Sequence, residues 1–538
     1  MTTFPTPGQS AAVYLRPEVK LEPLVCKWYA WPHLIAPAQL AMNVAFRLLP
    51  QLQSFVSNPA VHAVANADPR LYGGPFVALE PDDVQRVRAL IDATATDCAE
   101  LVQLAQDLKT LDATLQEKAT GYCLNEFYPR LPASLRGLVE LVYDLNNHPS
   151  IRLFEGLLYD DDLTSRTQEI LLQPVPERGR KFFMSTPRLP TPGSVALRMK
   201  FSDPRIDVLA RSRREPVRLD ELCRLFEGAL PADAMDDFRA LFTDQAPAGR
   251  GDQAPAGAGV RVRYFGHACV LLQSATTSIL VDPFVAIEPG DDGRFSIADL
   301  PERIDYVVIS HSHHDHCAPE ILLQLRHRIG RILVPRNNTG CLADPSTKLI
   351  LSELGFDNVD VLDPLDTVAV PGGEILSLPF AGEHCDLNIY SKQAIAVTLE
   401  GRKFMFLVDS DGWDTTLYER AMRRLGRLDA LFLGMECQGA PLNWLYEPLL
   451  TRPVNRRNNE SRRLSGADSE RAWKVLEATG LPPVFVYAMG QERWMNYVMG
   501  LEYEPDSIQL LESAKFLDRC ERAGIPARRL YGAHEQEF

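Results

Sequence analysis

The sequence predicts a two-part protein, in which a mainly helical N-terminal domain precedes a C-terminal α/β domain whose sheets are covered by helices. Three observations support this prediction. Apolar residues before residue 243 recur at helical spacing, residues 243–259 are of low complexity, and short apolar strands alternate with helical segments after them. A chain of 538 residues is long enough to form several domains with their own cores.

The composition narrows the class of protein. A formal net charge of −15 argues against nucleic acid or an anionic membrane as the main partner, because both require a basic face. No apolar run approaches the ~18 residues of a membrane span, and the N-terminus has no secretory signal pattern. The ten cysteines form no C-x-x-C pair, so we expect reduced thiols in a cytoplasmic protein.

The N-terminal domain is predicted to cover residues 1–242. Helical stripes predict helices over residues 40–55, 84–108 and 135–147. Alternating apolar residues predict a strand over residues 195–201. This part of the chain contains no metal-binding motif.

Residues 243–259 are predicted to be a linker. The sequence Asp-Gln-Ala-Pro-Ala-Gly occurs twice, at residues 244–249 and 252–257. Such a Pro/Ala/Gly segment cannot build an apolar core.

The C-terminal domain is predicted to cover residues 260–538. Strands that follow one another closely indicate antiparallel rather than doubly wound parallel sheet. The predicted strands are residues 260–264, 269–273, 278–281, 306–309, 331–334, 375–379, 394–400, 403–408 and 430–433. The predicted helices are residues 319–326, 415–425 and 469–479.

The most informative motif is H-x-H-x-D-H, which directly follows the strand predicted at residues 306–309. It contains His311, His313, Asp315 and His316. Imidazole and carboxylate bind first-row metals without a thiolate, so four such side chains in six residues are enough for two neighbouring metals. The alternative is a solvated loop that is rich in histidine by chance.

Further metal-type residues follow other predicted strands. Glu383 and His384 come after the strand at residues 375–379, and Asp409 comes after the strand at residues 403–408. A carboxylate next to a buried strand is costly unless it has a partner, and a metal is the strongest partner available. Taken alone, Asp409 fits a turn or a helix cap equally well. The nearby Cys317 and Cys385 are predicted to pack rather than to bind metal.

This pattern resembles the metallo-β-lactamase fold over residues 260–538. The resemblance rests on residues 264–268 (Tyr-Phe-Gly-His-Ala), residues 280–283 (Leu-Val-Asp-Pro), the H-x-H-x-D-H motif, the Gly-Glu-His segment and Asp409. It implies an αββα sandwich with two metals at one edge. It further implies that His311 and His313 bind the first metal, that Asp315 and His316 bind the second, and that Asp409 bridges them.

The sequence departs from the hydrolases of that fold in two places. Glu383 precedes His384 where those enzymes usually have a histidine, and adjacent extended side chains point in opposite directions, so only one is expected to reach the metals. The late histidine ligand has one candidate, His534, for which a surface position is equally plausible. Carboxylate oxygen suits iron, so the departure favours O₂ activation over water activation.

A closer resemblance covers the whole chain and includes residues 22–25 and 28–31. The chain resembles the CmlA-type diiron β-hydroxylases of chloramphenicol biosynthesis. The resemblance implies a diiron monooxygenase that hydroxylates the β-carbon of an amino acid held on a nonribosomal peptide synthetase carrier domain, with O₂ as co-substrate. It also implies a homodimer. The ligands it implies are His311, His313, Glu383, Asp315, His316 and Asp409, and His384 then has an orienting or packing role.

Other roles are predicted less directly. The chain has no dinucleotide-binding G-x-G-x-x-G after a strand, so we expect a separate reductase or ferredoxin to supply electrons. Glu436, after the predicted strand 430–433, is a catalytic candidate that could hydrogen-bond the cluster, or equally a structural carboxylate. His267 is predicted to have an orienting or structural role rather than to bind metal. Two alternatives stay open, namely a zinc-dependent hydrolase of a lactone, ester or phosphodiester and a purely structural metal site.

A basic cluster at residues 452–463 contrasts with the acidic chain. Its five arginines are Arg452, Arg456, Arg457, Arg462 and Arg463. We expect this segment either to meet a carrier domain or its phosphate, or to be a solvated loop.

Overall fold

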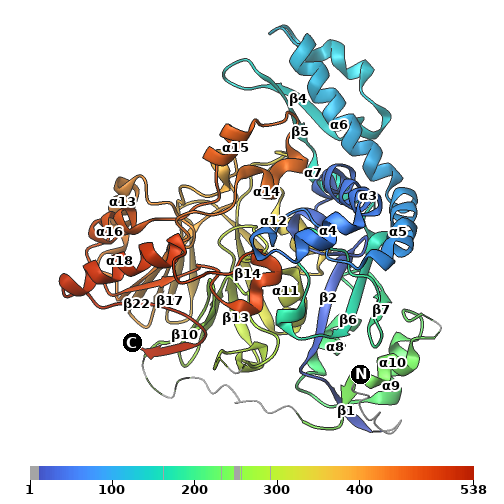
Figure 1. The fold of residues 1–538 in the computed structure, drawn as a ribbon. Coiled ribbons are helices and arrows are strands. Elements are labelled where there is room, and N and C mark those ends of the chain that lie inside the picture. Colours follow the sequence, from blue (N-terminus) through green and yellow to red (C-terminus); the bar gives the residue numbers. More distant parts are fainter. Residues whose placement is uncertain are drawn as a thin grey trace.

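The computed structural model describes residues 11–160, 163–231, 233–246, 255, 257, 259–290 and 292–538. Figure 1 shows the N-terminal part, coloured blue to green, beside the C-terminal part, coloured yellow to red. Most of the predicted linker, including half of the first six-residue repeat and most of the second, lies outside the described residues. The chain enters the second part directly after it, at strand β10.

The C-terminal part contains two seven-stranded sheets. In order across the first sheet, the strands are β15 (Val359–Leu362), β14 (Ile329–Pro335), β13 (Ile304–Val308), β12 (Ser278–Val281), β11 (Cys269–Gln273), β10 (Arg261–Gly266) and β23 (His534–Glu537). Across the second they are β16 (Thr367–Val370), β17 (Gly373–Leu378), β18 (Ala394–Leu399), β19 (Arg402–Phe406), β20 (Ala430–Gly434), β21 (Val484–Tyr487) and β22 (Ala527–Arg529).

The prediction of antiparallel sheet is correct for only part of each sheet. Strands joined by short turns, such as β10–β11–β12 and β16–β17–β18–β19, are antiparallel. The strands from β12 to β15 and from β19 to β22 are parallel. Longer connections, most of them with helices, precede these strands, and such connections allow parallel pairing. Parallel pairing places successive strand ends at one edge of the sandwich, which is where the predicted metal residues lie.

The two sheets face each other across a shared apolar core. Side chains such as Val270 and Ile279 of the first sheet and Val397 and Phe406 of the second belong to one buried cluster. Helices cover the outer faces, with α11 (Pro319–Leu325) and α12 (Thr347–Glu353) on the first sheet and α13 (Thr415–Leu425), α16 (Ser469–Ala478) and α18 (Ile508–Arg522) on the second. The predicted αββα sandwich is therefore confirmed.

Helices make up more of the N-terminal part than strands do. They are α1 (Pro32–Ile35), α2 (Pro37–Asn43), α3 (Leu49–Ser57), α4 (Pro59–Asn66), α5 (Val84–Asp97), α6 (Ala99–Lys118), α7 (Glu155–Asp160), α8 (Arg205–Arg211), α9 (Leu219–Phe226) and α10 (Met235–Ala240). The stripe predicted over residues 40–55 is helical and its apolar residues are buried. The helix predicted over residues 84–108 exists but breaks at Cys98, whose ψ of 18° is not helical.

The helix predicted over residues 135–147 is wrong. Residues Val139–Tyr143 form strand β4, which pairs with β5 (Pro149–Leu153) in a hairpin. Valine and tyrosine favour a pleated strand, and Asn147 at φ 61° closes the turn. Strands β1 (Ala12–Leu15), β2 (Val19–Val25), β3 (Trp28–Tyr29), β6 (Gln168–Pro174), β7 (Val195–Arg198), β8 (Val217–Arg218) and β9 (Phe242–Thr243) complete the small sheets, and of these only β7 was predicted.

The N-terminal part packs against the outer face of the first sheet. A single apolar cluster runs from β2 and α2 through α11 to β13. A buried ionic network crosses the same boundary. Arg180 pairs with Glu22 of β2 and with Glu320 of α11, and Tyr29 also donates to Glu320 at 2.9 Å. The two parts are thus joined by both apolar and charged contacts.

In the part of the chain that the structure describes, every helix is too short or too polar to traverse a lipid bilayer.

Candidate metal centre

The predicted metal-binding side chains come from three strand ends that meet at one edge of the sandwich. The histidine-rich motif, residues 311–316, lies in the loop between β13 and α11. Glu383 lies in the loop after β17, and Asp409 lies in the segment after β19. All six predicted ligands are buried.

Three groups of ligand-type atoms occupy this edge, and within each group the atoms lie within 4.8 Å of one another. The groups are His313–Glu383–Asp409, His311–His316–Asp409 and His267–Asp315–His316. Asp409 belongs to the first two groups and His316 to the last two, so the three groups form one continuous site. The structure therefore brings together all six residues that the sequence predicted.

Asp409 occupies the middle of this site. Its Oδ2 lies 3.1 Å from Nε2 of His316 and 3.5 Å from Nε2 of His311. On the other side, Oε1 of Glu383 lies 3.3 Å from Nδ1 of His313. Glu383 thus points toward the site from the second sheet, while the histidines point toward it from the first.

Hydrogen bonds behind two of the imidazoles determine which nitrogen faces the site. Nδ1 of His316 lies 2.9 Å from Oδ2 of Asp282, and a carboxylate only accepts, so Nδ1 donates. The Ser310 hydroxyl donates to Asp282 at 2.7 Å and accepts from Nδ1 of His311 at 2.9 Å. When these rings are neutral, each Nε2 presents a lone pair to the site, as a metal ligand requires.

Tyr446 links two histidines at the side of the site nearest Glu383. Its Oη lies 2.8 Å from Nε2 of His313 and 2.8 Å from Nδ1 of His384. With Nε2 of His313 bonded to Tyr446, its Nδ1 faces Glu383. His384 stays outside the three groups, and its ring packs on His313 with the centroids 4.4 Å apart. This arrangement fits the supporting role predicted for His384.

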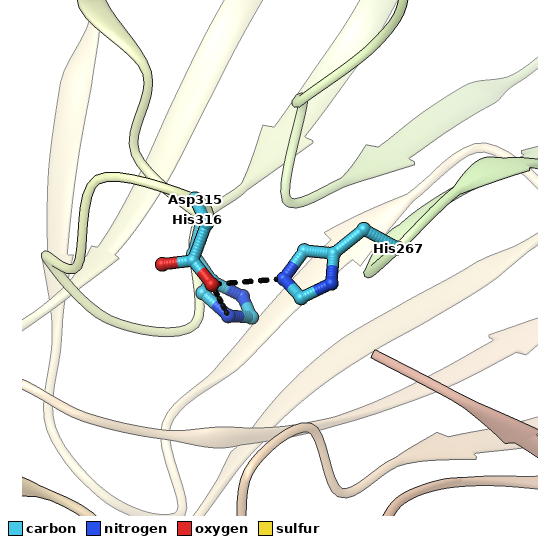
Figure 2. Close-up of side chains that lie close together, drawn as sticks. All are labelled: His267, Asp315 and His316. Atoms are coloured by element: carbon cyan, nitrogen blue, oxygen red, sulfur yellow. Dashed lines mark hydrogen bonds and ion pairs between the residues drawn. The ribbon is translucent and has the colours of Figure 1, made fainter. Parts of the chain in front are cut away.

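His267 contacts the site through Asp315 (Figure 2). Its Nε2 lies 2.9 Å from Oδ2 of Asp315, and its Nδ1 accepts the backbone N–H of Gly490 at 3.2 Å. A neutral ring that accepts at Nδ1 carries its proton on Nε2, so His267 donates to Asp315 and has no lone pair left for a metal. The geometry fits the orienting role predicted for this residue.

Left-handed backbone conformations gather around the site. Glu383 has φ 52°, His384 has φ 56°, and His267 and Asp282 have φ 47° and 42°. A non-glycine residue in this region costs on the order of 1–3 kcal/mol and persists where the surroundings determine its position. The fold therefore holds Glu383 and His384 in a conformation that an ordinary turn would not adopt.

The buried carboxylates of the site favour a bound cation. Burial, followed by the charges of Asp409 and Asp315, raises the pKa of Glu383 well above its usual range. Burial opposes a charge on His316, yet Asp409 and Asp315 outweigh it and raise that pKa. Burial lowers the pKa of His313 to about 4, which favours the neutral, metal-binding imidazole. The site thus combines crowded carboxylates, which favour a positive charge on His316, with the neutral imidazole of His313.

Two metal ions fit this donor set. Nε2 of His316 is buried and has no hydrogen-bond partner among the described residues, although a carboxylate oxygen lies 3.1 Å away. A metal between them would satisfy both atoms. Donors of imidazole and carboxylate type, without thiolate, suit iron.

Glu436 lies two residues after β20, which runs parallel to β19 and so ends at the same edge as Asp409. Its carboxylate has no hydrogen-bond or ion-pair partner in the described part of the chain. Burial, followed by the charges of Glu383 and Asp409, raises its pKa well above the usual range. The charges of the site therefore act on Glu436, although Glu436 does not belong to the three groups.

The remaining candidates lie outside the three groups. His534 is in the edge strand β23, where it pairs with Tyr264, and its ring packs on Phe485 at 5.6 Å. Cys317 and Cys385 are buried thiols, as the packing prediction required.

Asp282 and Tyr446 are functional residues whose roles the sequence did not predict. Asp282 directly follows the apolar strand β12, which is the signal that singled out Asp409, so the same reasoning could have found it. Tyr446 ends the short helix α14 (Leu442–Tyr446), which contains no motif. Only the fold places its hydroxyl beside His313.

Both parts of the chain match known families. The family described as diiron non-heme beta-hydroxylase N-terminal domain matches residues 14–247, and the beta-lactamase superfamily domain matches residues 261–415. The 4-amino-L-phenylalanyl-[CmlP-peptidyl-carrier-protein] 3-hydroxylase of Streptomyces venezuelae is 34% identical over 525 residues, covering 96% of this chain and 98% of that protein.

Solved structures agree with these matches. The crystal structure of CmlA, a diiron β-hydroxylase from Streptomyces venezuelae, has a TM-score of 0.91 at 33% identity and covers 98% of this chain and all of that one. A Glu-to-Asp variant of CmlA gives a TM-score of 0.88 over the same coverage. These matches confirm the resemblance expected from the motifs and favour a hydroxylase over a zinc-dependent hydrolase. The chain therefore belongs to the diiron non-haem β-hydroxylases, a family of O₂-dependent monooxygenases whose metal domain has the β-lactamase-superfamily fold.

Proposed function

We propose that this protein hydroxylates the β-carbon of an amino acid that is held as a thioester on the carrier domain of a nonribosomal peptide synthetase. The observation that carries this proposal is the full-length match to a relative named for 3-hydroxylation of a carrier-bound aminoacyl group. The 3-position of an amino acid is its β-carbon. The buried site, with its three carboxylates, supports the same chemistry.

Six side chains would hold the iron pair. His311, His313 and Glu383 would bind one ion, Asp315 and His316 would bind the other, and Asp409 would bridge the two. The support is geometric, since Asp409 lies between the two groups of histidines. When bound, the iron pair supplies the redox chemistry needed to activate O₂, which amino-acid side chains lack.

The protein's own groups would prepare the site for that pair. Asp282 and Ser310 hold the imidazoles of His316 and His311 with their lone pairs inward. Glu436, whose raised pKa favours a protonated carboxyl, would hold a proton beside the site. Glu436 would then have the catalytic role, rather than the structural role, among the two that its position after a strand predicted.

Several partners follow from this proposal. The described residues contain no dinucleotide-binding motif, so a separate reductase or ferredoxin would deliver electrons. A homodimer and a cytoplasmic location remain predictions, and the ten free cysteines are compatible with the latter. The product class, a β-hydroxylated amino acid on a synthetase, suggests a role in the biosynthesis of a peptide antibiotic.

The test combines metal analysis with a turnover assay. Purified protein should contain iron and should absorb in the near ultraviolet and visible when its iron is ferric, whereas a zinc protein would not. Reduced protein, O₂ and carrier-bound amino acids should yield a product heavier by one oxygen atom in mass spectrometry. Zinc alone, or release of free amino acid without oxygen incorporation, would overturn the proposal.

A further inference from the structure

A cavity of about 480 Å³ opens between the two parts of the molecule and extends to Tyr446, beside the metal centre. Its walls come from α6, the β4–β5 hairpin, residues 338–343, Leu387 with Asn388, and residues 449–451. Tyr446 also lines it, and the Oη of this residue is bonded to His313 and His384. A chain threaded into this cavity would thus end one side chain away from the candidate metal ligands.

The basic segment predicted from the sequence begins at the rim of this cavity. Thr451 lines the cavity and Arg452 follows it. Helix α15 (Arg456–Ser461) comes next, and the segment returns to the wall at Arg462, whose Nε donates to the backbone oxygen of Cys385 at 2.8 Å. Cys385 lies two residues before the wall residue Leu387. Both ends of the segment are therefore held at the cavity.

Three arginines of this segment are exposed to solvent, and two of them are unpaired within the described residues. Arg452, Arg456 and Arg457 are exposed. Arg456 pairs with Glu460 within the helix, whereas Arg452 and Arg457 have no hydrogen bond or ion pair within the described residues. The other two arginines, Arg462 and Arg463, are occupied with backbone oxygens.

Acidic side chains line the part of the wall that the N-terminal part of the chain contributes. Asp112 of α6 and Asp144 of the β4–β5 turn line the cavity there. Arg152 also lines it but already pairs with Glu140. An anionic group at the mouth is therefore favoured on the side of α15, because arginine is the side chain best suited to phosphate.

We propose that Arg452, Arg456 and Arg457 bind the phosphate of the 4′-phosphopantetheine arm of the carrier domain, while the pantetheine part of the arm lies in the cavity and delivers the thioester toward Tyr446. This inference rests on the proposed carrier-bound substrate and adds the surface that receives it. The arm is a long flexible chain with one phosphodiester at its carrier end, so basic side chains near the mouth and a cavity behind them match its chemistry.

Two small probes that differ only in the phosphate test the proposal without any turnover. Binding of 4′-phosphopantetheine and of pantetheine to the full chain is measured at low salt by ligand-observed NMR. We expect wild-type protein to bind the phosphorylated probe about fivefold more tightly, because ion pairs exposed to solvent contribute only modestly to binding. The preference should shrink as salt is added.

The variant R452Q/R456Q/R457Q should lose this preference while it still binds pantetheine. Its matched control is R423Q/R424Q, which changes an exposed pair of arginines on α13 and should keep the preference. Thr451→Trp, at the exposed rim, should weaken both probes because it narrows the entrance. Equal binding of the two probes to wild type, or a preference that survives the triple variant, would overturn the proposal.

These outcomes are independent of the hydroxylation assay. Binding is measured on protein without substrate or reductant, so a chain that binds the arm but does not hydroxylate would refute the proposed function alone. A chain that hydroxylates carrier-bound substrate yet shows no phosphate preference would refute the docking surface alone.

Discussion

At the scale of single residues, the candidate metal centre depends on which atoms point inward. Asp282 and Ser310 determine the tautomers of His316 and His311, and neither belongs to the histidine-rich motif. Groups that orient a metal ligand in this way hold the ring in place and raise its basicity. The site is therefore a product of its supporting hydrogen bonds as much as of its ligands.

Replacing Asp282 by asparagine tests this support. The side-chain amide cannot accept from both Ser310 and His316 as a carboxylate does, so we expect iron affinity to fall about 10–100-fold. Competition with a chelator measures the change. The control is Asp363→Asn, because Asp363 lies outside the site and is far more exposed than Asp282. This variant should leave the iron affinity unchanged. Unaltered affinity in the Asp282 variant would contradict the orienting role.

The adjacent pair Glu383 and His384 allows a sharper comparison. Glu383→Gln removes a charged oxygen from the group around Asp409, so iron per chain should fall from two ions toward one. His384→Asn keeps a hydrogen-bonding group near Tyr446 and should retain both ions. Iron content and the visible spectrum of the two variants provide the measurement. The reverse pattern would make His384 the ligand.

At the scale of elements, contacts between α7 and the segment before α12 join the two parts of the chain. Glu155, the first residue of α7, accepts the backbone N–H of Ser346 at 2.6 Å, and Ser346 caps α12. Burial raises the pKa of Glu155 to about 7. The carboxyl group is thus more easily protonated in the folded than in the unfolded chain, where its pKa is about 4.5.

This shift predicts a pH dependence of stability. A pKa that is raised on folding adds stability that is complete below about pH 4.5 and is lost as pH rises to about 7. Glu155→Gln removes this titration, so the stability of wild type relative to the variant should fall by up to about 3 kcal/mol across that interval. Urea unfolding at pH 5 and pH 8 measures it, with the exposed Glu117→Gln as control. A difference that does not change with pH would contradict the prediction.

At the scale of the whole molecule, the two parts share one apolar cluster and one ionic network. Arg180 is fully enclosed between Glu22 of the N-terminal sheet and Glu320 of α11. Because these contacts cross the boundary, neither part keeps its buried surface when the other unfolds. We therefore expect a single unfolding transition for the full chain.

Arg180→Met tests this coupling. The substitution removes the cation shared by two buried carboxylates, so that Glu22 keeps Arg188 while Glu320 keeps only neutral donors such as the Tyr29 hydroxyl. Breaking a buried ion pair costs about 3–5 kcal/mol. Urea unfolding followed by tryptophan fluorescence should shift by that amount and remain one transition. Arg178→Met, at a half-exposed neighbour, should change little. Two separate transitions would show that the parts unfold independently.

The sequence by itself determined nine of the fourteen strands of the metal domain, the six clustered side chains and the family, because period-two apolar runs, metal-type residues at strand ends and motif spacing are local properties. It misjudged residues 135–147 and most N-terminal strands, since pairing partners that are distant in the chain decide whether an apolar segment becomes a strand. Only the tertiary structure decided that Tyr446 meets His313, that Asp282 orients His316 and that the segment leading to α15 starts at the cavity wall. Those contacts join segments far apart in the chain, and no local pattern encodes them.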